Sequence, residues 1–211
     1  MDIEQKWNST RTWRALAKLG NKKLVQRMYI WLFITPSAVK LLDTFENWLI
    51  ESFQNNIQVD LSLPFSWWLF FFASLAFTLG NIWFSIFCPN IIRNHANYGD
   101  FAASRLPPML IWEFLRDFST IGKNKLNAKL GFPENEIIQA QYKHDNFYLK
   151  NTRKTIMKQP SDLFYDVYNA ANLDYWGQRL TVFLFYSLGI LLFGWVVLQN
   201  ITYAVGQLIN S

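Results

Sequence analysis

Two long stretches of the chain contain no charged residue at all. Residues 66–88 (SWWLFFFASLAFTLGNIWFSIFC) are uncharged over 23 positions, and residues 180–198 (LTVFLFYSLGILLFGWVVL) over 19. At 1.5 Å rise per residue they would form helices of about 34 Å and about 28 Å, matching a hydrocarbon core of about 30 Å. A core helix of a soluble protein rarely needs to be uncharged on all sides. Both stretches are therefore predicted to be transmembrane helices.

Lysine and arginine are confined almost entirely to two blocks. Residues 1–27 hold seven of them and residues 93–179 hold twelve, whereas 41–92 and 180–211 hold none. Cytoplasmic segments of membrane proteins carry the excess of Lys and Arg. This pattern places 1–27 and 89–178 in the cytoplasm, with 53–65 and the C-terminus outside. An odd number of spans is then required, and residues 29–50 are the remaining candidate.

The predicted fold class is an all-α membrane protein with three transmembrane helices and a helical cytoplasmic region, placed in a bacterial inner (plasma) membrane. A fourth crossing at 107–121 is the alternative, although Glu113, Arg116 and Asp117 argue against it. The predicted organisation is a basic cytoplasmic N-terminal helix over 1–27, a transmembrane hairpin over 28–88 with spans at 29–50 and 66–88, a cytoplasmic region over 89–178, a span over 179–201 and a short external tail over 202–211.

Polar residues form a stripe on each of the first two predicted spans. Lys40 would lie about 16 Å beyond Tyr29, near the membrane midplane, where an unpaired charge costs roughly 2.5–3.5 kcal/mol. Asp43, one turn further, could pair with it. The stripes are predicted to face each other, as polar contacts between helices, as a functional polar path, or with Lys40 snorkelling to the interface. Their members are Lys40, Asp43 and Asn47 on the first span and Ser74, Thr78, Asn81 and Ser85 on the second.

Ala76 and Gly80 form a small-xxx-small pair on a neighbouring face of the second span. Small residues at this spacing let helix backbones approach closely, so this pair is predicted to be a helix-packing site.

The N-terminal segment combines cations with tryptophan, a composition suited to the anionic inner leaflet. Binding to the membrane surface is preferred here, and direct nucleic-acid binding is not expected. The predicted headgroup contacts are Arg11, Arg14, Lys18, Lys22, Lys23 and Arg27.

The region 89–178 is predicted to contain a helix over 107–122, a loop over 123–136, a helix from Pro133 toward Lys158 and another over 160–176. Aromatic residues recur in these helices beside acidic ones, as in protein-binding faces. The equal alternative is that they pack inward. The candidate partner-docking residues are Trp112, Phe164, Tyr165, Tyr168, Tyr175 and Trp176.

No motif of a phosphate loop, a dinucleotide site, a zinc site or a nucleophile elbow is present in the sequence. His95 and Asp100 lie in a stretch rich in turn formers, and a membrane-bound lipid-modifying enzyme using them is one alternative function. The leading prediction is a protein that is not an enzyme and needs no metal or cofactor. An ion-conducting or membrane-disrupting effector channel, based on the polar stripes, is the other alternative.

The overall layout is similar to that of the membrane subunit of the Kiwa anti-phage defence system of bacteria. The likeness consists of 211 residues, several spans, a basic cytoplasmic side and no enzymatic motif. That family is associated with four spans, whereas this sequence shows three. The resemblance implies a homo-oligomer that senses infection at the inner membrane and holds a soluble DNA-binding partner. The leading hypothesis is therefore a sensor or scaffold in contact with membrane lipids, further copies of itself and a soluble cytoplasmic protein.

Overall fold

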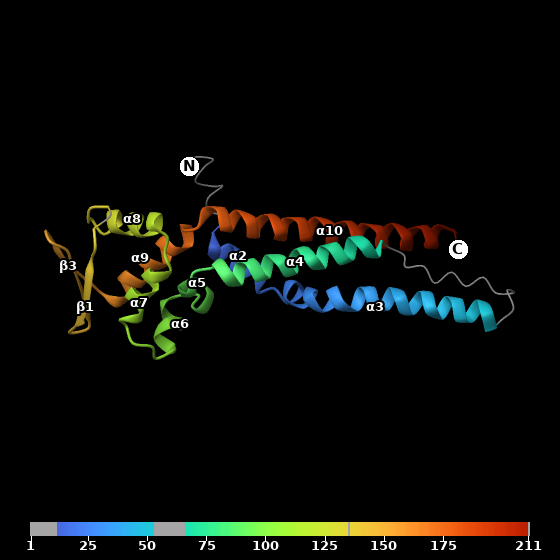
Figure 1. The fold of residues 1–211 in the computed structure, drawn as a ribbon, viewed down its shortest axis with the longest axis horizontal. Coiled ribbons are helices and arrows are strands. Elements are labelled where there is room, and N and C mark those ends of the chain that lie inside the picture. The colour runs from blue at the N-terminus through green and yellow to red at the C-terminus, as the bar shows by residue number, and fades with distance from the viewer. Residues whose placement is uncertain (1–11, 53–65, 135, 211) are drawn as a thin grey trace. The chain divides into compact units, whose positions relative to one another are not determined.

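The computed structural model describes residues 12–52, 66–134 and 136–210, and it shows a mostly helical chain with one small β-sheet (Figure 1). The chain divides into two compact units. One unit, here called the module, comprises 1–19 and 83–180; the other, here called the long-helix unit, comprises 20–82 and 181–211.

Three long helices supply the long-helix unit: α3 (Lys23–Ser52), α4 (Trp67–Phe87) and α10 (Trp176–Asn210). Among the described residues, α4 and the Trp176–Ile209 part of α10 are long and apolar enough to cross a membrane. Only 28% and 22% of their most apolar windows are buried, whereas the core helix of a soluble protein would be mostly buried. Most of the apolar surface of both helices therefore faces outward.

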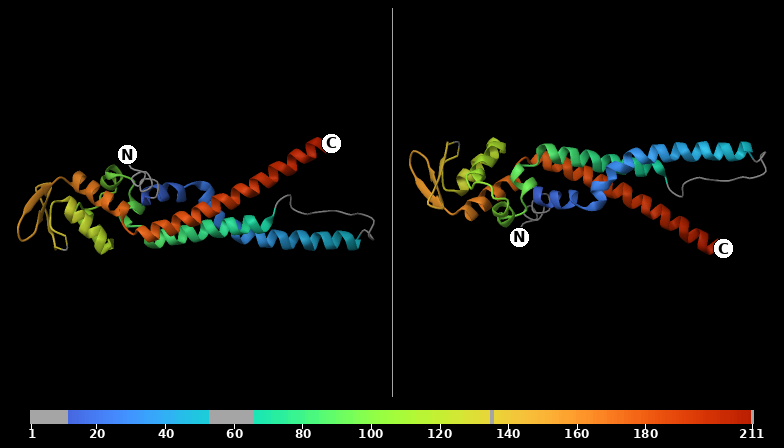
Figure 2. Two further views of the ribbon diagram at one scale, coloured as in Figure 1. Left: turned by 90° about the horizontal axis from the view of Figure 1, so that it is seen from above. Right: turned by 90° about the horizontal axis from the view of Figure 1, so that it is seen from below.

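Helices α3 and α4 are antiparallel and pack through their facing side chains. The Ser74 hydroxyl lies 3.8 Å from the Met28 sulfur, and the Trp31 and Phe70 rings meet edge to face at 5.6 Å. The Phe70 ring also contacts Phe193 of α10. Aromatic side chains thus join the three helices. Both α3 and α10 extend beyond the first residue of α4 (Figure 2).

The helices of the module are short. They are α2 (Trp13–Gly20), α5 (Asn90–Asn94), α6 (Tyr98–Ala103), α7 (Leu110–Glu113), the 3-10 helix η1 (Phe114–Asp117), α8 (Thr120–Lys129) and α9 (Pro160–Leu173). The buried face of α9 provides the centre of the core, with Leu163, Phe164, Val167 and Ala171 all fully buried. Their spacings of one, three and four residues keep them on one helix face.

Residues 139–158 form a three-stranded antiparallel sheet in the order β1-β2-β3. The strands are β1 (Gln139–Lys143), β2 (Asn146–Lys150) and β3 (Thr155–Lys158). Phe147 and Leu149 are fully buried on the inner face, and their alternation with exposed neighbours is the period of a strand. The predicted helix from Pro133 to Lys158 is therefore wrong, and the region 89–178 is not entirely helical.

The predicted helix over 107–122 is also replaced by shorter elements. Helix α7 and η1 contain four residues each, about 14 Å in all, which is far short of a hydrocarbon core of about 30 Å. Ile111, Phe114 and Phe118 are buried in the module. The segment 107–121 therefore does not form a fourth spanning helix.

Part of the predicted loop over 123–136 is helical instead. Helix α8 starts after Ser119, whose side-chain oxygen accepts a hydrogen bond from the Gly122 N–H at 3.0 Å. This N-cap satisfies a backbone donor that the first turn leaves without a partner.

The ends of the chain differ from prediction as well. The N-terminal helix expected over 1–27 stops at Gly20, and Lys23 already belongs to α3; residues 1–11 lie outside the described part. The external tail expected from 202 continues α10 as far as Asn210.

Asp174, at the end of α9, joins several elements of the module. Its backbone oxygen accepts a hydrogen bond from the Trp13 indole at 3.0 Å. Its carboxylate accepts from the Ser119 N–H at 2.8 Å, from the Ser119 hydroxyl, and from the Tyr175 N–H at 2.9 Å. A Cβ at Gly122 would lie 2.5 Å from one carboxylate oxygen, so only glycine fits there. Asp174 therefore fixes the starts of α2 and α8 against the α9–α10 junction.

Asp166 makes a second link between elements of the module. The ammonium groups of Lys129 and Lys158 lie 2.8 Å and 3.0 Å from its two carboxylate oxygens. Burial alone would raise the pKa of this carboxyl, but the hydrogen bonds and charges of the two lysines outweigh burial and lower the pKa. The pair of contacts holds α8 and β3 on α9.

Candidate functional site

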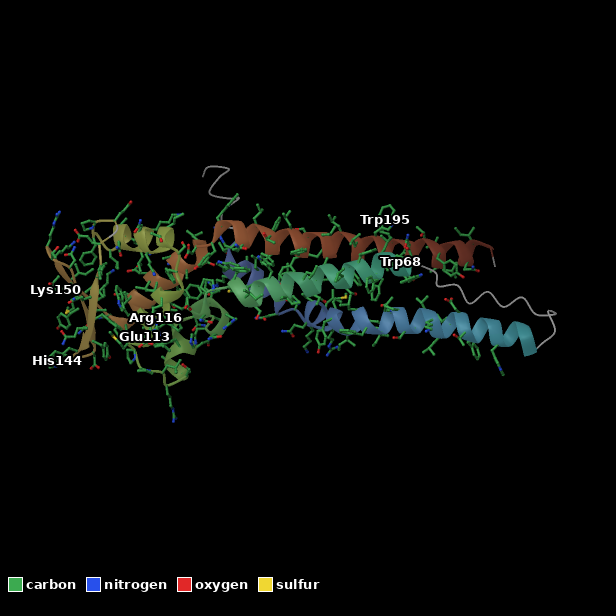
Figure 3. The ribbon with its side chains drawn as sticks, in the orientation of Figure 1. Trp68, Glu113, Arg116, His144, Lys150 and Trp195 are labelled. Carbon is green, nitrogen blue, oxygen red and sulfur yellow. The ribbon has the colours of Figure 1, made fainter. Side chains whose placement is uncertain are left out.

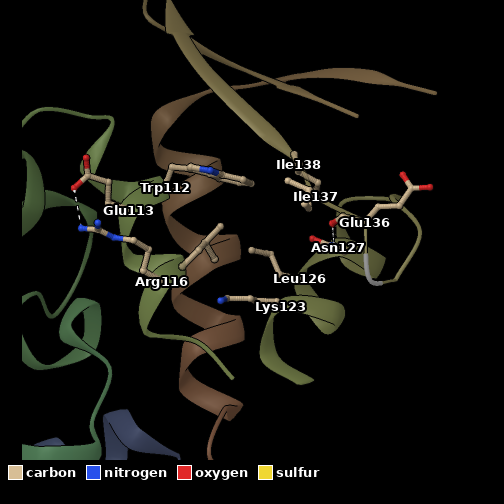
Figure 4. A pocket seen from close by; sticks show the side chains of 10 residues that line it. Trp112, Glu113, Arg116, Lys123, Leu126, Asn127, Glu136, Ile137 and Ile138 are labelled. Atoms are coloured by element: carbon tan, nitrogen blue, oxygen red, sulfur yellow. Dashed lines mark hydrogen bonds and ion pairs between the residues drawn. The ribbon is translucent and has the colours of Figure 1, made fainter. Parts of the chain in front are cut away.

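An apolar pocket of about 460 Å³ opens on the module between α7, α8 and the start of the sheet (Figure 4). Its apolar walls are Trp112, Leu115, Leu126, Ile137 and Ile138, and its polar rim is Glu113, Arg116, Lys123, Asn127 and Glu136. Ile137 is 87% exposed at the edge of this open pocket. We call this feature the Trp112 pocket.

Hydrogen bonds hold the far wall of the Trp112 pocket in place. The Asn127 amide donates to the Glu136 backbone oxygen at 3.0 Å, and the Asn151 amide donates to the Glu136 carboxylate at 2.5 Å. The segment that presents Ile137 is thus tied to both α8 and the sheet. At the opposite edge, Arg116 and Glu113 form an exposed ion pair at 3.8 Å, which adds little stability.

The outer face of the sheet forms a shallow, basic surface next to this segment in the sequence. Lys143, Tyr148 and Lys150 line a hollow of about 610 Å³ there. Residues 139–157 contain four Lys or Arg and one carboxylate, that of Asp145. His144, in the turn between β1 and β2, and Lys150, the last residue of β2, are labelled on this surface in Figure 3. The surface therefore favours a partner with negative charge.

An open apolar pocket that is followed in the chain by a basic sheet surface can bind an apolar side chain carried on an acidic segment. Apolar anchors that fill pockets provide most of the energy of protein interfaces, and charges around them favour association and specificity.

The predicted docking aromatics do not form one face. Phe164 is fully buried and Tyr168 is 3% exposed, because α9 must cover the core with this face. Phe164 packs against the rings of Tyr98 and Phe101. Burial raises the pKa of Tyr168, as expected for a phenol withdrawn from water. Phe164 and Tyr168 are thus core residues, as the inward-packing alternative describes.

The other docking candidates lie apart from one another. Trp112 lines the Trp112 pocket, Tyr165 is 47% exposed on the outer side of α9, and Trp176 is 63% exposed at the start of α10. Tyr175 is half-buried, and its hydroxyl donates to the Asp117 backbone oxygen at 2.8 Å. Of the six predicted residues, only Trp112 lines this pocket.

His95 and Asp100 have structural surroundings. His95 is 7% exposed and packs edge-on against the rings of Phe101 and Phe114. Burial lowers its pKa, and the nearby Asp100 opposes this only in part. The Asp100 carboxylate accepts from the Ala96 N–H at 3.2 Å and closes the turn before α6. The geometry assigns His95 to an aromatic core and Asp100 to a turn.

The two polar stripes are not brought together. Met28 contacts Ser74 and Trp31 contacts Phe70, so Trp67, the first residue of α4, lies roughly one turn past Trp31 along α3. Lys40 lies further along α3, where both it and Asp43 are exposed. Within the described residues, no ion pair joins Lys40 to Asp43. The side chain of Asn47 lies outside the described part.

The hydroxyls of the second stripe turn back onto their own helix instead. Ser74 donates to the Phe70 carbonyl at 3.0 Å and Thr78 to the Ser74 carbonyl at 2.8 Å. Asn81 accepts a hydrogen bond from the Tyr186 hydroxyl at 2.7 Å, and the Ser85 carbonyl accepts one from Arg93. The side chains of Ser74, Thr78 and Asn81 thus have hydrogen-bond partners other than Lys40.

Gly80 lies where α10 approaches α4 most tightly. A Cβ at Gly80 would lie 2.8 Å from two ring carbons of Tyr186, and Ala76 next to it is 4% exposed. On α10, a Cβ at Gly189 would lie 3.0 Å from the Phe77 ring. The two glycines thus admit the aromatic side chains of the opposite helix.

The predicted headgroup cations within the described part are all exposed: Arg14, Lys18, Lys22, Lys23 and Arg27. Their apolar neighbours Trp13, Leu16 and Val25 are instead buried in the protein. Among its described residues the segment buries these three and exposes Leu24 (51%), so contact with lipid there would depend mainly on charge. Arg11 lies outside the described part.

Residues whose structural roles sequence reasoning missed are Ile137 and Asp174. Ile137 lies two residues before Gln139, the first exposed residue of β1, and so continues the two-residue period of the strand. The prediction of a helix in this region left that period unnoticed. Asp174 has no local sequence signal, because its partners Trp13 and Ser119 lie far away in the chain.

No protein-family model, curated protein or solved structure matches the chain. Among the described residues, no group of three or more His, Cys, Asp or Glu could hold a metal ion.

Proposed function

We propose that the chain is an integral inner-membrane sensor or scaffold without enzymatic activity, with the module on the cytoplasmic side. The support for membrane insertion is the outward-facing apolar surface of α4 and α10. Leu191 is 71% exposed and Leu198 56% exposed, and each requires a lipid or protein neighbour. Trp68 and Trp195, both more than half exposed (Figure 3), suit a membrane interface.

Helix α3 is the third span of this proposal. It is one continuous helix of 30 residues, about 45 Å long, which exceeds the hydrocarbon core. Its first residues are basic and its second half has only Lys40 as a cation, so its N-terminal end is the cytoplasmic one. With three spans, the N-terminus is cytoplasmic and the C-terminus external.

The outward apolar faces of α4 and α10 also provide a surface on which further copies can pack, so we include a homo-oligomer in the proposal. The likeness in layout to the Kiwa membrane subunit extends the proposal to anti-phage defence. In that role the module would hold a soluble partner near the membrane.

The proposed docking site is the Trp112 pocket, and its proposed occupant is a large apolar side chain within an acidic segment of a soluble protein. One observation carries this proposal: Ile137 is 87% exposed at an open apolar pocket, and the residues that follow it form the sheet surface on which Lys143 and Lys150 line a hollow. Acidic segments complement that charge, and an apolar side chain would cover Ile137.

A quantitative pull-down with the full chain in mild detergent tests the docking site. We expect the Ile137→Ser variant to bind its partner about thirtyfold more weakly, because truncating an interface anchor costs about 2 kcal/mol. Mass spectrometry of the eluates measures the loss.

Ile121→Ser is the matched control, since Ile121 is 66% exposed on α8 but does not line the pocket. The control variant should retain the partner. Equal capture by both variants, or a captured protein without an acidic segment, would contradict this docking site.

A further inference from the structure

A second pocket, of about 470 Å³, lies where α4 ends. It is lined by Ile86, Phe87, Cys88, Pro89, Asn90, Arg93, Asp117 and Tyr175. We call it the Arg93 pocket. Its wall changes from apolar, at the last residues of α4, to charged, at Arg93 and Asp117.

The amide of Asn90 connects the two charges of this pocket. Arg93 donates to the Asn90 side-chain oxygen at 2.5 Å and to the Ser85 carbonyl at 2.7 Å. The Asn90 amide nitrogen in turn donates to the Asp117 carboxylate at 2.7 Å. In the described part of the chain, neither Arg93 nor Asp117 has an ion-pair partner. A guanidinium and a carboxylate are thus held near each other without neutralising each other.

The pocket borders both helices that could cross a membrane. Ile86 and Phe87 end α4, Tyr175 precedes α10, and the Trp83 indole donates to the Gln178 amide oxygen at 2.8 Å, which joins the two helix ends. Ile86 is 65% exposed beside the charged wall. If α4 and α10 cross the bilayer, as the proposed function states, this pocket lies at the level of the inner headgroups.

We propose that the Arg93 pocket binds the headgroup of a phospholipid with a primary amine. Arg93 binds the phosphate, the Asp117 carboxylate binds the ammonium, and the acyl chains lie along Ile86 and Phe87. Guanidinium groups match phosphate geometry, and a primary ammonium has three hydrogen-bond donors for a carboxylate.

The charges of the pocket select among headgroups. The phosphatidylglycerol headgroup offers the same phosphate to Arg93 but has no ammonium, so the Asp117 carboxylate is left without a cation. A choline headgroup has no N–H donor for Asp117. Free phosphate could also bind Arg93, but it has no acyl chains to lie along Ile86 and Phe87. Phosphatidylethanolamine satisfies all three parts of the pocket.

Native mass spectrometry of the full chain with equal phosphatidylethanolamine and phosphatidylglycerol tests the proposal. We expect wild type to retain the ethanolamine lipid in about tenfold preference, the size of one charge-assisted contact. Arg93→Gln should lower retention of the ethanolamine lipid about tenfold. Asp117→Asn, which can still accept from Asn90, should bring the ratio of the two lipids close to one.

Arg105→Gln, at an exposed arginine outside the pocket, is the control and should behave as wild type. The unfolding temperature of each variant without added lipid verifies that it folds. An unchanged lipid ratio in the Asp117→Asn variant would overturn the proposal. So would stabilisation by inorganic phosphate alone equal to that by the ethanolamine lipid.

Alkaline carbonate extraction of the wild-type membranes distinguishes a failure of this headgroup site from a failure of the proposed membrane insertion. Retention in the washed membranes without a lipid preference refutes the headgroup site alone. Release of the chain by carbonate refutes membrane insertion and, with it, the position of the pocket.

Discussion

Replacing Asp174 with alanine is expected to destabilise the module by about 3 kcal/mol or more. Asp174 is 5% exposed, and its carboxylate accepts from the Ser119 N–H, the Ser119 hydroxyl and the Tyr175 N–H. Each buried donor that loses its partner costs about 1–3 kcal/mol. The loss should appear as a lower free energy of unfolding of the full chain, measured by tryptophan fluorescence during denaturation in mixed micelles.

Asp162→Ala is the matched control for this experiment. Asp162 is exposed in the first turn of α9, where a carboxylate adds about 0.3–1 kcal/mol through the helix dipole. A similar loss in both variants would show that Asp174 is not the junction between α2, α8 and α9.

Replacing Gly80 with leucine should destabilise the long-helix unit by about 1–3 kcal/mol, the usual cost of overpacking. The new Cβ would lie 2.8 Å from the Tyr186 ring, which is 1% exposed and whose hydroxyl bonds to Asn81. The ring would have to move and would lose that hydrogen bond. Unfolding of the full chain in mixed micelles measures the effect.

Gly194→Leu provides the control for Gly80, because a Cβ at Gly194 meets no atom within 4 Å. That variant should be as stable as wild type. If Gly80→Leu were equally well tolerated, the close approach of α10 to α4 would be contradicted.

The long uncharged runs predicted α4 and most of α10 correctly, because a helix of twenty apolar residues needs only local sequence to be recognised. The sheet was missed for the opposite reason. QAQYK in β1 contains no β-branched residue. The hairpin turn uses His144 and Asp145, both at positive φ, in place of the Asn-Gly pair that marks such turns. The burial of Phe147 and Leu149 on one face decides the strand through tertiary contacts.

The candidate sites could be predicted only in part. Trp112 was identified because an aromatic residue in a mixed helix is a local signal. Its pocket also needs Leu126 and Ile137, whose positions depend on the sheet. The Arg93 pocket unites residues from 86 to 175, so no local pattern predicts it. For Lys40 and Asp43 the local pattern was clear but the tertiary prediction failed. Helical spacing predicted that their stripe faces the stripe of α4, whereas the register of α3 on α4 keeps the two stripes apart.

Cysteine labelling in cells tests the three-span arrangement most directly. With Cys88 replaced by serine, single cysteines are introduced by Lys18→Cys, Glu134→Cys and Gln207→Cys, all at exposed positions. A membrane-impermeant maleimide added to intact spheroplasts should label the Gln207→Cys variant, and it should label the other two only after lysis. Labelling of all three from the same side would contradict the proposed threading of the chain through the membrane.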